Sequence, residues 1–107
     1  MIDAIRKAID FTEGKNRLDL ERDEMLALSL VRLLEVIGEA ANNTSEEFRS
    51  KHPKIPWRNM VGIRNRLIHG YFDVDLGIVW DTVIRDLPSV LTDLESLEVN
   101  SIDPDIG

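Results

Sequence analysis

The sequence predicts an all-α fold, a bundle of four or five helices, on three observations. Apolar residues recur every third or fourth position along most of the chain, which is the period of an amphipathic helix. No segment alternates between apolar and polar residues as a strand does. The chain has 107 residues and no cysteine, which predicts one domain with a single core and excludes disulfides and thiolate chemistry. We expect this helical domain to span residues 1–98, followed by a flexible tail over residues 99–107.

Two helices are predicted in the N-terminal part of the chain. The first carries Ile2, Ile5 and Ile9 on one face and is expected to end near Gly14. The second spans residues 23–42 and has the strongest helical pattern in the sequence. A further set of apolar residues widens its stripe: Leu28, Val31, Leu34 and Val36. Most of this helix is therefore apolar, which predicts a central position with neighbours on several sides.

Caps and prolines bound the elements in the middle of the chain. Thr44 or Ser45 is suited to cap a short helix that precedes a connector over residues 52–56. The connector contains two prolines, which do not fit inside a helix. Its second proline, Pro56, is well placed to begin a helix over residues 57–68.

The C-terminal part predicts a turn over residues 70–75 and then a long helix over residues 76–97. Pro88 lies inside this helix and is expected to kink it. Trp57 and Trp80 are at apolar positions of their helices, so we expect both in the core.

The net charge of −7 by itself argues against a nucleic-acid partner, because an acidic protein repels phosphate. Its distribution weakens that argument: residues 48–72 contain six basic residues and no acidic one, whereas residues 1–47 and 73–107 carry net charges of −5 and −8. This basic segment is either a solvated face that pairs with the acidic remainder or a strip that binds anions. No apolar run is long enough for a membrane span, and the N-terminus lacks the apolar core of a signal peptide, so we expect a cytoplasmic protein without membrane contact.

A helical wheel drawn for residues 57–68 places Arg64 in the middle of the apolar face. An unpaired guanidinium is too costly to bury, so either Glu35 or Glu39 pairs with it, or this face opens onto an interface or cleft. The polar side of the wheel carries Arg58, Gly62, Asn65 and His69. Arg64 and His69 lie about 140° apart, so they reach one ligand only if the helix loosens or a second chain completes the site. On geometry alone His69 is also a candidate helix C-cap.

Several short blocks of sequence follow one another in a fixed order. They are residues 37–41 (IGEAA), 56–57 (PW), 63–75 (IRNRLIHGYFDVD), 79–80 (VW) and 86–88 (DLP). In the third block, Arg64 is followed after four residues by His69 and then by Tyr71. This ordered set resembles the HepT family of HEPN-domain proteins, whose hallmark is an Arg, four to six residues, a His and a Tyr two positions later. The resemblance covers residues 26–91.

The resemblance implies a dimeric, up-and-down helical HEPN domain that acts as a metal-independent endoribonuclease, the toxin of a toxin–antitoxin pair. The partners it implies are RNA, a second copy of the chain and a nucleotidyltransferase antitoxin of the MntA type. In the family this antitoxin silences the toxin by transferring AMP to the Tyr of the motif, which is Tyr71 here. The motifs of two subunits line one cleft, so Arg64 would face the partner subunit.

The motif residues suit RNA cleavage by the neighbouring 2′-hydroxyl. His69 suits the general acid/base, because imidazole changes charge near neutral pH, and Arg64 suits the bidentate cation that stabilises charge on the phosphorane. Asn65 is a candidate supporting residue that orients His69 or contacts phosphate. The cations expected to attract the RNA backbone are Arg49, Lys54, Arg58 and Arg66. No metal or cofactor is expected, and the alternative function is a non-catalytic HEPN module that binds a nucleotidyltransferase or a nucleotide.

Overall fold

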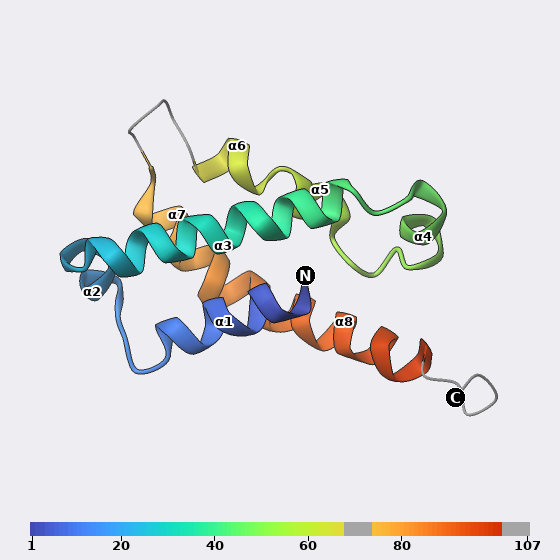
Figure 1. Ribbon diagram of the computed structural model, residues 1–107, viewed down its shortest axis with the longest axis horizontal. Helices are drawn as coiled ribbons and strands as arrows, with labels where there is room; N and C mark the ends of the chain where they lie inside the picture. The colour runs from blue at the N-terminus through green and yellow to red at the C-terminus, as the bar shows by residue number, and fades with distance from the viewer. Residues whose placement is uncertain (68–73, 102–107) are drawn as a thin grey trace.

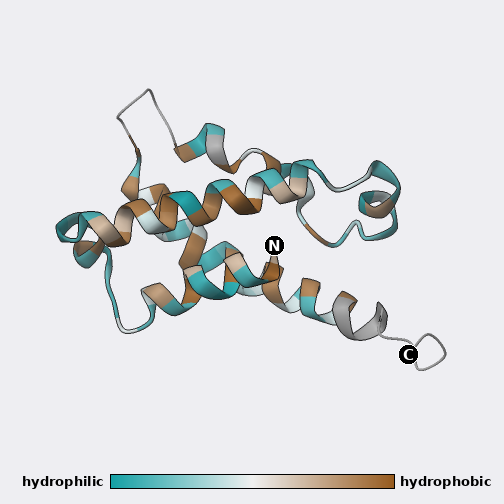
Figure 2. Cartoon of the chain, in the orientation of Figure 1, coloured by the Kyte–Doolittle hydropathy of each residue, from teal (hydrophilic) through white to brown (hydrophobic). Residues whose placement is uncertain are grey.

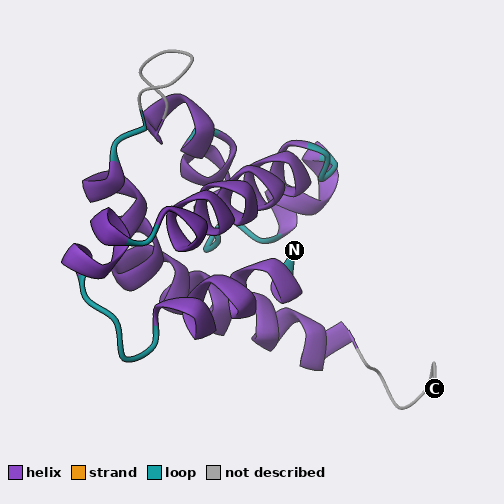
Figure 3. Cartoon of the chain, turned by 60° about the vertical axis from the view of Figure 1, so that its left-hand side comes forward, coloured by secondary structure: helices purple, strands orange, loops and turns teal. Residues whose placement is uncertain are grey.

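The computed structural model describes residues 1–67 and 74–101, with the side chains of residues 64 and 98–101 excepted. Its elements are α1 (Ile2–Thr12), α2 (Arg17–Arg22), α3 (Glu24–Asn42), α4 (Glu46–Lys51), α5 (Trp57–Val61), α6 (Ile63–Leu67), α7 (Leu76–Asp81), the π-helical turn η1 (Thr82–Asp86) and α8 (Leu87–Ser101). Within the described ranges every element is helical, as Figure 3 shows, which confirms the predicted all-α class. The helices are more divided than the four or five that the sequence predicts.

The long helix α3 occupies the centre of the molecule. It contacts α1, α2, α5, α6 and α7. Figure 1 shows α1 and α8 on one side of α3, α5 and α6 on the other, and α4 at the end where these two layers diverge. Leu30, Leu34 and Ile37 are fully buried, which confirms the predicted central position. The expectation for Leu28 is wrong: its side chain is 61% exposed, because no described element covers that margin of α3.

The connection between α1 and α3 contains a helix that the apolar spacing does not predict. As expected, α1 ends just before Gly14, which adopts a left-handed φ of 74° that glycine accepts without strain. Helix α2 then begins with a capping box. The Asp19 N–H donates to Asn16 Oδ1 (3.0 Å), and the Asn16 N–H donates to Asp19 Oδ2 (2.8 Å). These two reciprocal hydrogen bonds satisfy backbone donors at the start of the helix and explain why so short a segment is helical.

The helix predicted over residues 57–68 is interrupted at Gly62, which separates α5 from α6. The Gly62 N–H closes α5 on the carbonyl of Arg58, and glycine is about 1 kcal/mol less favourable than alanine inside a helix. The helix α5 crosses α3 at the buried Gly38, where a Cβ would lie 3.1 Å from the carbonyl oxygen of Met60. Gly38 therefore lets the backbone of α5 lie directly against α3, which sets the position of the basic segment.

The helix predicted over residues 76–97 is also divided, into α7, η1 and α8. Proline has no N–H, so Pro88 cannot donate to the carbonyl of Ile84. The Leu87 N–H donates instead to the carbonyl of Thr82, five residues earlier. The kink expected at Pro88 thus takes the form of a π-helical turn directly before it.

The core confirms most of the predicted apolar faces. Trp57 is buried, as expected, with 8% of its surface exposed, whereas Trp80 is partly exposed and packs against the margin of the core. Figure 2 shows that apolar residues, in brown, recur along α3 and α1 between polar ones. The largest fully buried side chains are Ile5, Leu20, Leu30, Leu34, Ile37, Leu67, Val79, Val83 and Leu87.

Candidate functional site

The basic segment, residues 48–72, runs from α4 through the connector to the end of α6 and beyond. The side chain of Arg64 and the whole of His69 and Tyr71 lie outside the described residues. The predicted catalytic and modified positions therefore stay predictions. The helices that flank and hold this motif, α6 and α7, are described.

Backbone contacts fix both ends of the part of the chain that carries the motif histidine and tyrosine. The Asp75 N–H donates to the carbonyl of Leu67 (2.8 Å), which joins the end of α6 to the start of α7. The Asp75 side chain also caps α7, because its Oδ1 accepts from the Ile78 N–H (3.1 Å). Arg17 of α2 lies against this start: its Nη2 is 2.7 Å from where a Cβ on Gly77 would be, so a larger residue there would displace the end of this side chain.

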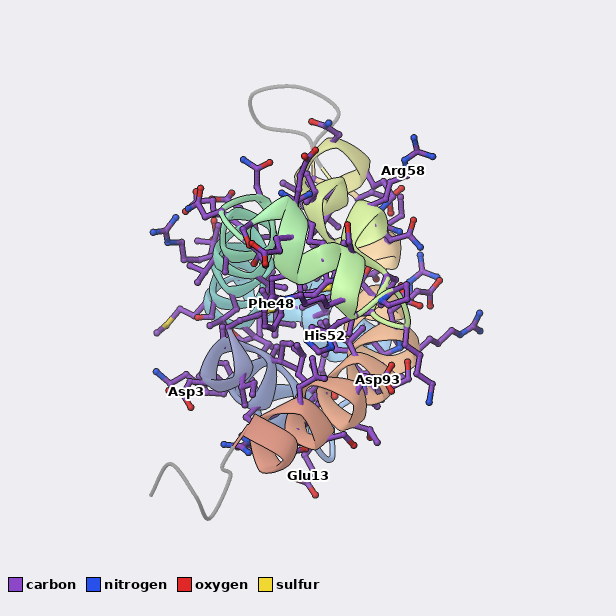
Figure 4. The ribbon with its side chains drawn as sticks, turned by 90° about the vertical axis from the view of Figure 1, so that its right-hand side faces the viewer. Asp3, Glu13, Phe48, His52, Arg58 and Asp93 are labelled. Carbon is purple, nitrogen blue, oxygen red and sulfur yellow. The ribbon has the colours of Figure 1, made fainter. Side chains whose placement is uncertain are left out.

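Three of the four cations predicted to bind RNA are exposed. They are Lys54 in the connector, Arg58 in α5 and Arg66 in α6. Figure 4 shows Arg58 on the outer surface, with its side chain pointing away from the helices. Asn65, the predicted supporting residue, is exposed as well. The helix predicted to carry both Arg58 and Asn65 is interrupted at Gly62, and the two residues are exposed on its separate parts.

The fourth cation, Arg49, is engaged within the fold. Its Nε donates to the carbonyl of Thr44 (2.9 Å), and its Nη2 donates to the carbonyl of Asn42 (3.0 Å). Carbonyls at the C-terminal end of a helix lack partners within the helix, and a cation placed there stabilises it. Arg49 therefore ties α4 to the end of α3. Ser45 caps α4, as predicted, by accepting from the N–H of Phe48 (3.1 Å).

The two carboxylates considered as partners of Arg64, Glu35 and Glu39, lie one turn apart on the same face of α3. Glu39 is exposed. Glu35 is one-quarter exposed and pairs with Arg32 at 3.5 Å, three residues earlier on the same helix. A contact between either carboxylate and Arg64 falls outside the described residues.

An aromatic cluster within the basic segment is a feature that the sequence patterns did not predict. The ring centroids of Phe48 and His52 are 4.5 Å apart, and those of Phe48 and Trp57 are 6.0 Å apart in an edge-to-face arrangement. The Trp57 Nε1–H donates to the carbonyl of His52 (2.9 Å). The cluster borders a groove of about 790 Å³ between α4 and the ends of α1 and α8, and Figure 4 labels Phe48 and His52, which line it. The signal that could have predicted it is the spacing of His52 and Trp57, which follow Phe48 by four and nine positions.

A smaller cleft of about 120 Å³ lies beside α6, and we call it the Arg66 cleft. One wall comes from the start of α5 and from α6, and the other comes from η1 and the start of α8. It is lined by Pro56, Asn59, Met60, Ile63, Arg66, Thr82, Asp86, Leu87, Ser89 and Val90. The Arg66 Nη2 donates to the carbonyl of Asn59 (3.2 Å), which bridges the break at Gly62. The cleft thus places a cation of the basic segment opposite the acidic end of η1.

The described part of the chain contains neither a candidate metal site nor a candidate membrane span. In residues 1–67 and 74–101 we find no group of three or more His, Asp or Glu side chains arranged to hold a metal ion. No helix in those same ranges has both the length and the apolar character needed to cross a bilayer.

Comparison with known proteins identifies the family. The model of the family described as "Ribonuclease HepT-like" matches residues 1–97, a range that contains Arg64, His69 and Tyr71. The chain belongs to this family. The match confirms the resemblance seen in residues 26–91 and extends it through α1 and most of α8.

Relatives of similar length lie in bacteria and archaea. The chain is 40% identical over 95 residues to the protein named "Probable ribonuclease HepT" of Thermococcus cleftensis, which covers 89% of this chain and 86% of that protein. It is 42% identical over 82 residues to a "Putative RNase" of Caldanaerobacter subterraneus subsp. tengcongensis, covering 77% of this chain and 73% of that one. A "Putative RNase" of Methanocaldococcus jannaschii is 35% identical over 109 residues, covering 95% and 90%. No solved structure matches this HepT-like chain at a significant level.

Proposed function

We propose that this HepT-like chain is a metal-independent endoribonuclease, the toxin of a toxin–antitoxin pair, whose active site forms at a homodimer cleft. The observation that carries the proposal is the family match over residues 1–97, which spans the Arg64-x4-His69-x-Tyr71 motif. The names of the relatives, which are those of ribonucleases, agree with it.

The chemistry of the proposed reaction needs no group beyond the motif and the RNA. The 2′-oxygen attacks the adjacent phosphorus, the bond to the 5′-oxygen breaks, and the products end in a 2′,3′-cyclic phosphate and a 5′-hydroxyl. One imidazole accepts the 2′ proton and another protonates the leaving oxygen, so two copies of His69 in one dimer cleft meet the requirement. Arg64 places paired N–H donors on the phosphorane oxygens, where negative charge develops.

The exposed cations support an RNA substrate despite the net charge of −7. Lys54, Arg58 and Arg66 are exposed on one acid-free segment, while the rest of the chain is strongly acidic. Phosphate contacts from these side chains would attract the RNA backbone, and the acidic surface would keep RNA from binding elsewhere. Arg49 donates to two backbone carbonyls. We therefore expect it to attract the RNA backbone less than the three exposed cations do.

Regulation would act through the tyrosine of the motif. An MntA-type nucleotidyltransferase would join the Tyr71 oxygen to the α-phosphorus of ATP and release pyrophosphate. The AMP group adds bulk and negative charge beside the site, which excludes the substrate phosphate by repulsion. Mass spectrometry after co-expression with the partner tests this step: the mass of AMP is expected on the peptide that contains Tyr71, and its reproducible presence on another peptide would contradict the assignment.

Cleavage of RNA by the purified protein in EDTA tests the proposal. We expect wild-type cleavage with a cyclic phosphate end, and a loss of about 10²-fold or more in His69→Ala and in Arg64→Ala. His52→Ala and Arg85→Ala are the matched controls, because they remove the other histidine and an exposed arginine outside the basic segment. Intact RNA with the wild-type protein would favour the non-catalytic HEPN module, and cleavage that persists in both motif variants would reject the assigned roles.

A further inference from the structure

The Arg66 cleft combines an apolar floor with polar groups on two opposite walls. Its floor is formed by the buried side chains Met60, Ile63, Leu87 and Val90. On one wall stand Asn59 and Arg66, and on the other stand Asp86 and Ser89. A flat ligand with polar edges fits this arrangement, because its face contacts the floor while its edges meet the walls.

The charged side chains of the cleft have hydrogen-bonding atoms that remain available to a ligand. Arg66 donates one hydrogen bond, to Asn59, although a guanidinium has five N–H donors. Among the described residues the Asp86 carboxylate forms no hydrogen bond or ion pair, since only its backbone carbonyl accepts, from the Ser89 hydroxyl (3.1 Å). Arg66 and Asp86 therefore face the same space without pairing with each other. A ligand that presents acceptors to the first and donors to the second would satisfy both.

We propose that the Arg66 cleft is a base-specific subsite that receives a guanine of the RNA substrate, an inference that rests on the proposed ribonuclease function. Guanine presents two acceptors, O6 and N7, to a guanidinium, which is the commonest specific contact of arginine with a base. Its opposite edge presents the N1–H and N2–H donors, which match the two oxygens of a carboxylate. Adenine, cytosine and uracil each lack at least one of these two paired sets.

The size and position of the cleft agree with a single base. Its volume of about 120 Å³ is well below the roughly 300 Å³ of the smallest typical ligand sites. Such a cleft accepts a single base with its face on the floor, and the ribose and phosphate remain outside. Arg66 lies two residues after Arg64, so their Cα atoms are at most about 7.6 Å apart. Residues two apart on a helix point to different faces, so the guanine would belong to a nucleotide near the linkage that is cut and not to the linkage itself.

Sequencing the ends produced from an RNA library with randomised bases tests the inference. The wild-type protein is expected to cut with about tenfold enrichment of guanine at one position relative to the cut, as a bidentate base contact implies. In Asp86→Asn one acceptor oxygen becomes a donor, so this enrichment should fall to near that of the other bases while cutting continues. Asp81→Asn is the matched control, since Asp81 is exposed one helical turn earlier, outside the cleft, and should leave the enrichment unchanged.

A binding measurement separates failure of this inference from failure of the proposed function. Guanosine monophosphate titrated into the ¹⁵N-labelled protein should shift the amide signals of residues 59, 66, 86, 87, 89 and 90 more than the adenosine, cytidine and uridine monophosphates do, and Asp86→Asn should abolish the difference. Cutting without base preference, or with a preference that Asp86→Asn leaves intact, would overturn the subsite and leave the ribonuclease proposal standing. Selective guanosine binding by a protein that cuts no RNA would retain the subsite and reject the ribonuclease.

Discussion

Two helices are predicted, over residues 57–68 and 76–97, and both of the corresponding helical stretches are interrupted. The first, residues 57–67, contains three arginines and no acid, and it breaks at Gly62. The second, residues 76–101, contains one arginine and five acids, and its π-helical turn precedes Pro88. Both stretches border the Arg66 cleft. The cleft therefore lies where two oppositely charged and interrupted helical stretches meet.

The largest expected effect on stability tests the contact that holds residues 57–67 against α3. Gly38→Val places a branched side chain where even a Cβ would be 3.1 Å from the carbonyl of Met60. Backbone cannot yield as a flexible side chain does, so we expect the free energy of unfolding to fall by about 2 kcal/mol or more. Urea denaturation followed by circular dichroism measures it.

Ala40→Val is the matched control, because Ala40 lies two residues away on α3 and is only partly buried. It should lose only the difference in helix propensity, about 0.5 kcal/mol. Equal losses in the two variants would show that the backbone contact between α3 and α5 does not determine the position of the basic stretch.

The next effect separates structural cations from those that face the solvent. Arg49→Met removes the two hydrogen bonds to the carbonyls of Thr44 and Asn42. Because the side chain is only partly buried, we expect a loss of about 1 kcal/mol in the free energy of unfolding. Arg58→Met, which changes an exposed side chain, should alter it by less than about 0.5 kcal/mol. If Arg58→Met lost more free energy of unfolding than Arg49→Met in the same urea titrations, the structural role would belong to Arg58 and not to Arg49.

The salt dependence of RNA binding tests whether the exposed cations contact the RNA backbone. In a His69→Ala background, which is expected to bind without cutting, Arg58→Gln should weaken RNA binding and reduce the slope of log K against log salt by about 0.7. Fluorescence anisotropy with a labelled single strand measures both. An unchanged slope would place the RNA path away from α5.

The sequence predicted those features that depend on local patterns. The apolar stripe of α3, the end of α1 near Gly14 and the cap of α4 at Ser45 follow from spacing and cap chemistry, and they are confirmed. The break at Gly62 was not predictable in this way, because many helices tolerate a glycine and here the contact of α5 with α3 contributes. The candidate site likewise combines features that follow from local sequence with features that depend on distant contacts. The motif of Arg64 and His69 is read from residue order, whereas the opposition of Arg66 and Asp86 depends on helices distant in sequence.

The smallest effect tests the cause of the second interruption. Two local features favour the π-helical turn: Pro88 provides no N–H for the carbonyl of Ile84, and the Thr82 hydroxyl donates to the carbonyl of Ile78 (2.7 Å), a bond that bends helices. Pro88→Ala restores the missing donor, but Pro88 already lies in the first turn of α8, where proline is tolerated, so stability should change by less than about 1 kcal/mol. What should change is the hydrogen bond of Leu87, whose N–H would move from the carbonyl of Thr82 to that of residue 83, and a crystal structure would show it. If the π-helical turn persists in Pro88→Ala and disappears in Thr82→Val, the threonine and not the proline produces it, and the two stretches are then interrupted for unrelated reasons.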